Sequence, residues 1–157
     1  MSLFSCEEPE RAAGFEDLDE YSMYDYIVEN KERFSAFLSI LEIGELDAAL
    51  GSYNPKGSDY TLFLPDNDAI DSFIETSNQV SSLDDILNDP EFAAEFCRYH
   101  VVNIGVYSGN FPFGAFPEPT LSGDFLTVSF IVDLEQDTSF YKINNQAAVI
   151  KPNIEVS

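Results

Sequence analysis

The chain has few of the residues on which enzymes and nucleic-acid-binding proteins depend. Its 157 residues include one histidine, two cysteines and no tryptophan, and seven Lys or Arg side chains stand against 29 Asp or Glu. The formal net charge of −22 repels phosphate backbones and anionic lipid headgroups. Electrostatics therefore argue against nucleic acid and a bare membrane surface as partners, and allow cationic proteins or divalent cations. The alternative, which we favour, is that the charge serves solubility.

Catalytic motifs are also missing. The single histidine, His100, is not accompanied by a Gly-x-Ser-x-Gly elbow, and there is no Cys-x-x-Cys, His-Glu-x-x-His or glycine-rich phosphate loop. One histidine and two widely separated cysteines, Cys6 and Cys97, argue strongly against a zinc site. We therefore predict that the protein is not an enzyme, and that it has no catalytic residues, no metal site and no cofactor.

Long apolar runs are absent too: none reaches the roughly 18 residues of a membrane-spanning helix. Near the start, Leu3-Phe4-Ser5-Cys6 is similar to the end of a bacterial lipobox, in which the cysteine becomes lipidated. Acidic residues follow at once, as in surface lipoproteins of Bacteroidetes-type bacteria. We predict a lipid on Cys6 as the only membrane contact and residues 1–20 as a flexible acidic tether. The alternative is that Cys6 is incidental.

What the chain does have is enough apolar sequence for a core, at 45% of its residues. Helical spacing and capping residues dominate the first half. A helix that begins after Ser22 breaks near residue 30, and Gly44 ends the helix that follows it. Cys97 falls on the apolar side of a helix, as a small buried thiol. After the break near residue 30, the expected helices cover residues 35–43, 46–50, 66–76, 83–88 and 91–99.

Strand-forming residues dominate after His100. The stretch 125–132 is nearly continuous in apolar and β-branched residues, which predicts a strand buried on both faces or nearly so. Asn144-Asn145 predicts a turn. A helical first half and a strand-rich second half predict an α+β fold. The expected strands cover residues 60–64, 101–102, 106–107, 125–132, 139–144 and 148–156.

Three segments in order carry a resemblance to a known family. They are Tyr60-Thr61-Leu62-Phe63-Leu64-Pro65-Asp66-Asn67-Asp68-Ala69-Ile70-Asp71-Ser72-Phe73, Phe96-Cys97-Arg98-Tyr99-His100-Val101-Val102 and Tyr141-Lys142-Ile143-Asn144-Asn145-Gln146-Ala147-Ala148-Val149-Ile150. Together they resemble the fasciclin-type domain of cell-surface and secreted proteins, over residues 21–157. The resemblance implies a wedge of two β-sheets with helices packed along one side.

The resemblance also singles out Tyr99 and His100, since the Tyr-His region of adhesion domains in this family is implicated in receptor binding. The alternative is structural: His100 lies buried and hydrogen-bonded at a helix-to-strand junction and holds the corner. We favour the structural interpretation. It predicts that replacing His100 acts through stability.

A second candidate contact site is the loop 111–119, which has three Phe and three Pro in nine residues. Aromatic, proline-rich loops bind other chains or sugars when they are exposed. Alternatively, Phe111, Phe113 and Phe116 fold back onto the core as a plug. The sequence does not decide between these two interpretations.

Two functions follow from these observations. The first is a non-catalytic adhesion or protein-interaction module of a bacterial lipoprotein, anchored in the outer membrane and facing the surface or periplasm. The second is an envelope protein that binds a glycan or small ligand in nutrient capture. Either way the partner is an unidentified surface protein or polysaccharide.

The resemblance carries one further expectation, because domains of this family continue past the position of Ser157 with a strand that closes the sheet. We therefore expect the domain 21–157 to lack its final strand and to have an open sheet edge. An open apolar edge is a template for pairing with another chain. A weak homodimer is one such pairing.

Overall fold

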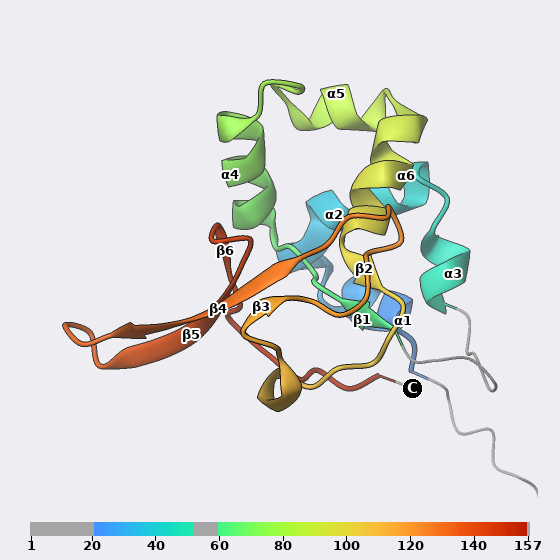
Figure 1. Ribbon diagram of the computed structural model, residues 1–157. Coiled ribbons are helices and arrows are strands. Elements are labelled where there is room, and N and C mark those ends of the chain that lie inside the picture. Colours follow the sequence, from blue (N-terminus) through green and yellow to red (C-terminus); the bar gives the residue numbers. More distant parts are fainter. Residues whose placement is uncertain (1–20, 52–59, 157) are drawn as a thin grey trace, which may run out of the picture.

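The computed structural model describes residues 21–51 and 60–156. The predicted tether 1–20 and Cys6 lie outside the described residues, as does Asn54-Pro55-Lys56-Gly57, a sequence that predicts a turn. In the described part the fold is α+β, as predicted, with two antiparallel sheets and the helices gathered on one side (Figure 1). The helices are α1 (Met23–Glu29), α2 (Lys31–Ile43), α3 (Asp47–Gly51), α4 (Asn67–Thr76), α5 (Leu83–Leu87) and α6 (Pro90–Tyr99). A short 3₁₀ turn spans Ser108–Asn110.

The helices begin where the sequence places capping residues. Ser22 and Ser82 each form a capping box with an Asp three residues later, and Asp66 caps α4 by accepting a hydrogen bond from the Ala69 N–H. The second helix begins earlier than predicted, at Lys31. It continues through a kink at Phe34, where φ is −119° and ψ is 19°. The predicted break near residue 30 is confirmed as the boundary between α1 and α2.

Gly44 follows α2, and its role is to allow two helices to approach closely. Its backbone is right-handed, with φ −76°, so the residue is not needed for a left-handed turn. A Cβ atom at this position would lie 2.9 Å from both the Cα and the N of Ala94 in α6. Only glycine lets α2 and α6 meet there without displacement of backbone atoms.

The strands form a small sheet and a larger one. In the small sheet β1 (Thr61–Leu62) pairs with β2 (Val101–Val102). In the larger sheet the order is β3 (Gly114–Ala115), β4 (Thr127–Asp133), β5 (Thr138–Ile143) and β6 (Ala147–Ala148). The β4–β5 hairpin extends away from the helices (Figure 1). Asn144 and Asn145 make the predicted turn after β5, both with positive φ.

Three strand predictions are wrong, and the smallest of these errors is that residues 106–107 lie in no strand. The stretch 125–132 is not buried on both faces, since Phe125 is 61% exposed and Val132 is 58% exposed. The hairpin projects past the helices, so nothing in the described residues covers its outer part. A further error is the strand predicted at 148–156. Ala147–Ala148 pairs with β5, the Val149 N–H donates to the Tyr141 carbonyl, and the chain then leaves the sheet.

Two apolar cores lie on either side of β2. The first packs under the helices around Phe37, Ile40 and Leu41, and the second lies beside the larger sheet around Phe116 and Leu126. Successive side chains of a strand point to opposite faces. Accordingly Val101 belongs to the first core and Val102 to the second, and both are fully buried.

Candidate interaction surface

Tyr99 and His100 lie where α6 passes into β2, as the sequence predicts. His100 is the C-cap residue of α6, and its backbone carbonyl accepts a hydrogen bond from the Phe63 N–H at 2.9 Å. Its ring Nδ1 lies 2.7 Å from the Phe96 carbonyl oxygen. A carbonyl can only accept, so Nδ1 carries the proton. Both the backbone and the ring of His100 therefore hold the helix-to-strand corner.

The surroundings of His100 are aromatic, and its side chain is partly buried. Its ring centroid lies 4.7 Å from that of Phe96 and 5.8 Å from that of Phe37. Burial lowers the pKa of His100 from its usual 6.5, and the bond to the Phe96 carbonyl opposes this effect. At neutral pH the ring is therefore uncharged and packs as part of the first core.

Tyr99 points toward the larger sheet and is 37% exposed. Its hydroxyl oxygen accepts a hydrogen bond from the Asn144 Nδ2 at 2.6 Å. Asn144 in turn accepts from the Thr127 N–H at 2.8 Å through Oδ1. Tyr99 thus ties the end of α6 to the turn after β5, which is a connection between the two halves that the sequence did not reveal.

Cys97, one turn before this junction, is a free and fully buried thiol, as predicted. Burial raises its pKa to about 12, so it is protonated at neutral pH and is a poor nucleophile. Within residues 21–51 and 60–156, no three His, Cys, Asp or Glu side chains are grouped closely enough to hold a metal ion.

The three phenylalanines of the 111–119 loop divide between the two interpretations left open by the sequence. Phe116 is 1% exposed, and its ring lies 6.0 Å from that of Phe63. Phe111 is partly buried, 5.2 Å from the Tyr141 ring. Phe113 is 85% exposed. Phe111 and Phe116 therefore pack as the plug interpretation expects, whereas Phe113 is the largely exposed member of the three.

The β4–β5 hairpin is an exposed apolar feature that sequence reasoning missed. Val128, Phe130 and Val132 share one face of β4, and their exposed fractions rise outward from 4% to 42% to 58%. Leu134, in the turn at the tip, is 89% exposed. Val128, Phe130 and Val132 alternate with Ser129 and Asp133, which argues against burial on both faces, but Ile131 interrupts the alternation. The pattern also does not predict that the outer part of the apolar face is exposed.

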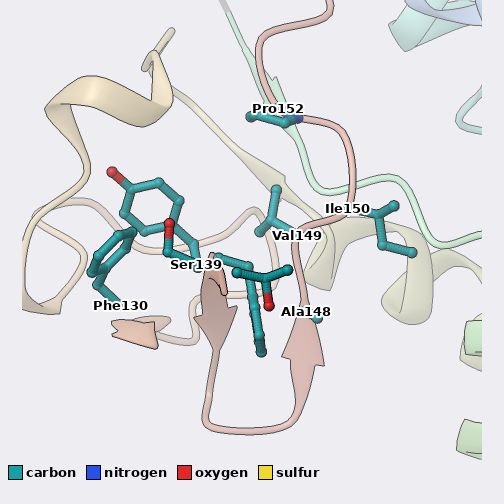
Figure 2. A pocket seen from close by; sticks show the side chains of 9 residues that line it. Phe130, Ser139, Ala148, Val149, Ile150 and Pro152 are labelled. Atoms are coloured by element: carbon teal, nitrogen blue, oxygen red, sulfur yellow. The ribbon is translucent and has the colours of Figure 1, made fainter. Parts of the chain in front are cut away.

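A groove of about 500 Å³ runs along the outer side of β5. Phe130 and the β5 residues form one wall, and the segment that leaves the sheet forms the other (Figure 2). The Phe130 and Tyr141 rings lie 5.2 Å apart on the β4–β5 face. The lining residues are Phe130, Thr138, Ser139, Phe140, Tyr141, Ala148, Val149, Ile150 and Pro152.

Comparison with known families accounts for most of the chain. The model of the Fasciclin domain matches residues 32–157. No curated protein matches the chain significantly. Fasciclin domains are adhesion or interaction modules, generally without catalytic activity and typically extracellular or surface-associated. Among the described residues no helix is both long and apolar enough to cross a membrane.

Proposed function

The chain belongs to the fasciclin domain family, and we propose that it serves as a non-catalytic adhesion or protein-interaction module of a bacterial cell-envelope lipoprotein. The family match over residues 32–157 is the observation that carries this proposal. The exposed apolar side chains of the β4–β5 hairpin support it, because large apolar patches on a soluble surface commonly mark sites of protein interaction.

Anchoring through Cys6 is the second part of the proposal. It is supported by Leu3-Phe4-Ser5-Cys6 and the acidic residues that follow. The anchor would hold the domain at the outer membrane, facing the surface or the periplasm. In the native host we expect maturation to be sensitive to globomycin and the N-terminal peptide to carry a lipid mass. If the native protein carries no lipid, the anchoring proposal is wrong, but the proposed adhesion role is unaffected.

Adhesion is tested with beads that carry the purified chain, added to intact cells of the producing organism. We expect the beads to bind cells, and the double variant Val132→Ser, Leu134→Ser to bind less, because it removes apolar area from the hairpin tip. Leu121→Ser is the matched control, since Leu121 is 42% exposed on another part of the surface. Equal binding by uncoated beads would contradict the adhesion role.

Envelope glycan capture is the second candidate, and the groove along β5 is the observation that favours it. Phe130, Phe140 and Tyr141 line the groove, and aromatic rings form the platforms on which sugars commonly stack. A polysaccharide array separates the two functions. Binding to a glycan that Tyr141→Ala abolishes, together with no adhesion of coated beads, would favour glycan capture.

A further inference from the structure

Strand β5 is paired along its whole length on one side only. On that side β4 is aligned with it from Thr138 to Ile143. On the other side β6 pairs with Lys142 and Ile143 alone, and the Val149 N–H donates to the Tyr141 carbonyl at 2.8 Å. Within the described residues no strand continues past that bond. The outer edge of β5 is therefore open from Thr138 to Phe140.

The open edge presents main-chain groups in a known orientation. In an antiparallel pair, alternate residues direct both their N–H and C=O toward the same neighbour. The Tyr141 carbonyl faces away from β4, because it accepts from Val149. Ser139, two residues earlier, therefore directs its N–H and C=O to the open side. An added strand would find a donor and an acceptor there.

The groove lies directly beside this edge. Figure 2 shows Phe130 and Ser139 on one side of it, and Val149 and Ile150 on the other. Ile150 is 72% exposed, although it lines an apolar surface. An extended chain laid along β5 would cover Ile150 and the outer part of Phe130 with alternate side chains. Main-chain pairing would contribute affinity, and these apolar walls would contribute specificity.

Charge decides between the classes of protein that could occupy the edge. Asp133, Glu135 and Asp137 lie around the turn that joins β4 to β5, beside the open end of the edge. The two ion pairs of the described residues are Arg33–Asp66 and Arg98–Glu95, so the hairpin carboxylates have no cationic partner in that part of the chain. A second copy carries the same net charge of −22, so the two copies repel each other. A cationic partner is therefore favoured over self-association.

We propose that an extended segment of a partner protein, apolar at alternate positions and with Lys or Arg at one end, adds to β5 as a further strand. Its main chain pairs with Ser139, its apolar side chains cover the groove, and its basic end lies against the hairpin carboxylates. This inference rests on the proposed interaction role, and names the surface and the chemistry of the partner.

Synthetic peptides test the proposal on the unmodified chain. The first probe has about eight residues, a typical strand length, with alternating Val and Thr and two Lys at one end. The second replaces Lys by Glu, and the third keeps Lys but is N-methylated at alternate residues, on the edge that would pair with β5. By fluorescence anisotropy we expect the first to bind, more weakly as salt rises, and the other two to bind at least about tenfold more weakly.

Variants of the chain locate the binding. Ser139→Pro removes the N–H on the open side, a change that edge strands tolerate. Because a main-chain hydrogen bond is lost, this variant should bind the Lys peptide about tenfold more weakly. Ser139→Ala keeps that N–H and should bind as the parent chain does. If Ser139→Pro lowers the unfolding midpoint, slowed amide exchange at Ser139 on adding peptide gives the same information on the unchanged chain.

The charge argument has its own variants. The double variant Glu135→Gln, Asp137→Asn should bind the Lys peptide about threefold more weakly than the parent chain does. The difference in affinity between the Lys and Glu peptides should become smaller. Both effects are modest, because each exposed ion pair contributes little. Asn at position 137 keeps a residue that tolerates the positive φ of 51° found there. Asp71→Asn with Glu75→Gln, on the exposed side of α4, is the matched control and should change neither affinity.

Several results would overturn the proposal. Equal binding of the N-methylated peptide, equal binding of the Glu peptide, or no binding of any peptide would each do so. A homodimer in sedimentation equilibrium that Ser139→Pro dissociates would assign the edge to a second copy. If the Ser139→Pro variant still adheres to cells, the β5 edge is not the adhesion surface, but the proposed function is unaffected. If the parent chain does not adhere, the proposed function itself is contradicted.

Discussion

The helical half of the molecule and its strand-rich half use apolar residues differently. Among residues 21–51 and 60–156, 13 buried apolar residues form one cluster under the helices, whereas the cluster beside the larger sheet has five. The strand-rich half leaves other large apolar side chains exposed, including Phe113 at 85% and Leu134 at 89%. The comparison indicates that stability resides mainly under the helices, and that the sheet is where the molecule has surface available to a partner.

The two halves meet around the end of α6. The Phe63 N–H donates to the His100 carbonyl, the Leu121 N–H donates to the Val101 carbonyl, and the Tyr99 hydroxyl accepts from Asn144. Because these hydrogen bonds connect the two halves, we expect the packing of the helical half to stabilise the strands as well. Variants in the core, at the junction and on the surface should therefore have distinct effects.

The largest effect is expected at the centre of the helical core. Phe37 is fully buried, so Phe37→Ala should lower the free energy of unfolding by about 3–5 kcal/mol, through lost burial and the cavity left behind. Urea unfolding followed by circular dichroism measures this change. Phe113→Ala is the control, and should stay within about 0.5 kcal/mol of the parent. Similar losses in both variants would contradict the division between the halves.

Packing between α2 and α6 gives the next effect. Gly44→Ala places a Cβ 2.9 Å from backbone atoms of Ala94, and should cost about 1–3 kcal/mol, as overpacking does. Gly109→Ala is the matched control, because a Cβ there meets no other atom within 4 Å. A neutral Gly44→Ala variant would mean that the two helices move apart freely.

At the junction, His100→Ala should cost about 1–3 kcal/mol, since it removes aromatic packing and the hydrogen bond to the Phe96 carbonyl. The measurement combines thermal unfolding with the bead adhesion assay. An unchanged melting temperature together with lost adhesion would overturn the structural role and support a contact role for His100.

The link between the halves should be weaker. Tyr99→Phe removes the acceptor for Asn144 and should cost about 0.5–1.5 kcal/mol. Asn144→Gly retains the positive φ of 51° and removes the same bond from the other side. A double-mutant cycle between the two variants measures the coupling. Zero coupling energy would show that Tyr99 does not tie α6 to the sheet.

The smallest effect is a dependence of stability on pH. Burial holds the pKa of His100 below 6.5 in the folded chain, so the unfolded chain takes up the proton at a higher pH than the folded chain. Stability from this source is complete above about pH 6.5 and is lost as the pH falls toward the folded pKa. Unfolding measured between about pH 7.5 and pH 5, where most carboxylates stay ionised, should be flatter for His100→Asn. A steeper profile would contradict burial of a neutral ring.

Most of the helical half could be predicted from the sequence. Ser22, Asp66 and Ser82 cap helices because their side chains bond to backbone N–H groups within one turn. That interaction needs no distant residue, so a local pattern is sufficient to predict it. Cys97 and the junction at His100 follow from the same periodicity. The start of α2 was misplaced because the chain continues through the kink at Phe34.

The strand-rich half depended on contacts that no local pattern contains. Val128 and Val132 lie on the same face of one strand, yet the first is buried and the second is exposed. The difference arises because the hairpin extends beyond the helices, and a hydrophobic side chain is buried only where another element covers it. The three phenylalanines of the 111–119 loop differ in exposure for the same reason. Other residues cover Phe116 and part of Phe111, whereas Phe113 is left exposed.

The sequence alone determined the α+β class, the helix boundaries set by capping residues, the family resemblance and the strongly acidic character of the chain. Tertiary structure alone decided that the chain leaves β5 after Val149 and so opens an edge and a groove. The physical reason is the difference in sequence range between the interactions involved. Capping and periodicity act within a few residues, whereas pairing and cover depend on where distant segments lie once the chain has folded.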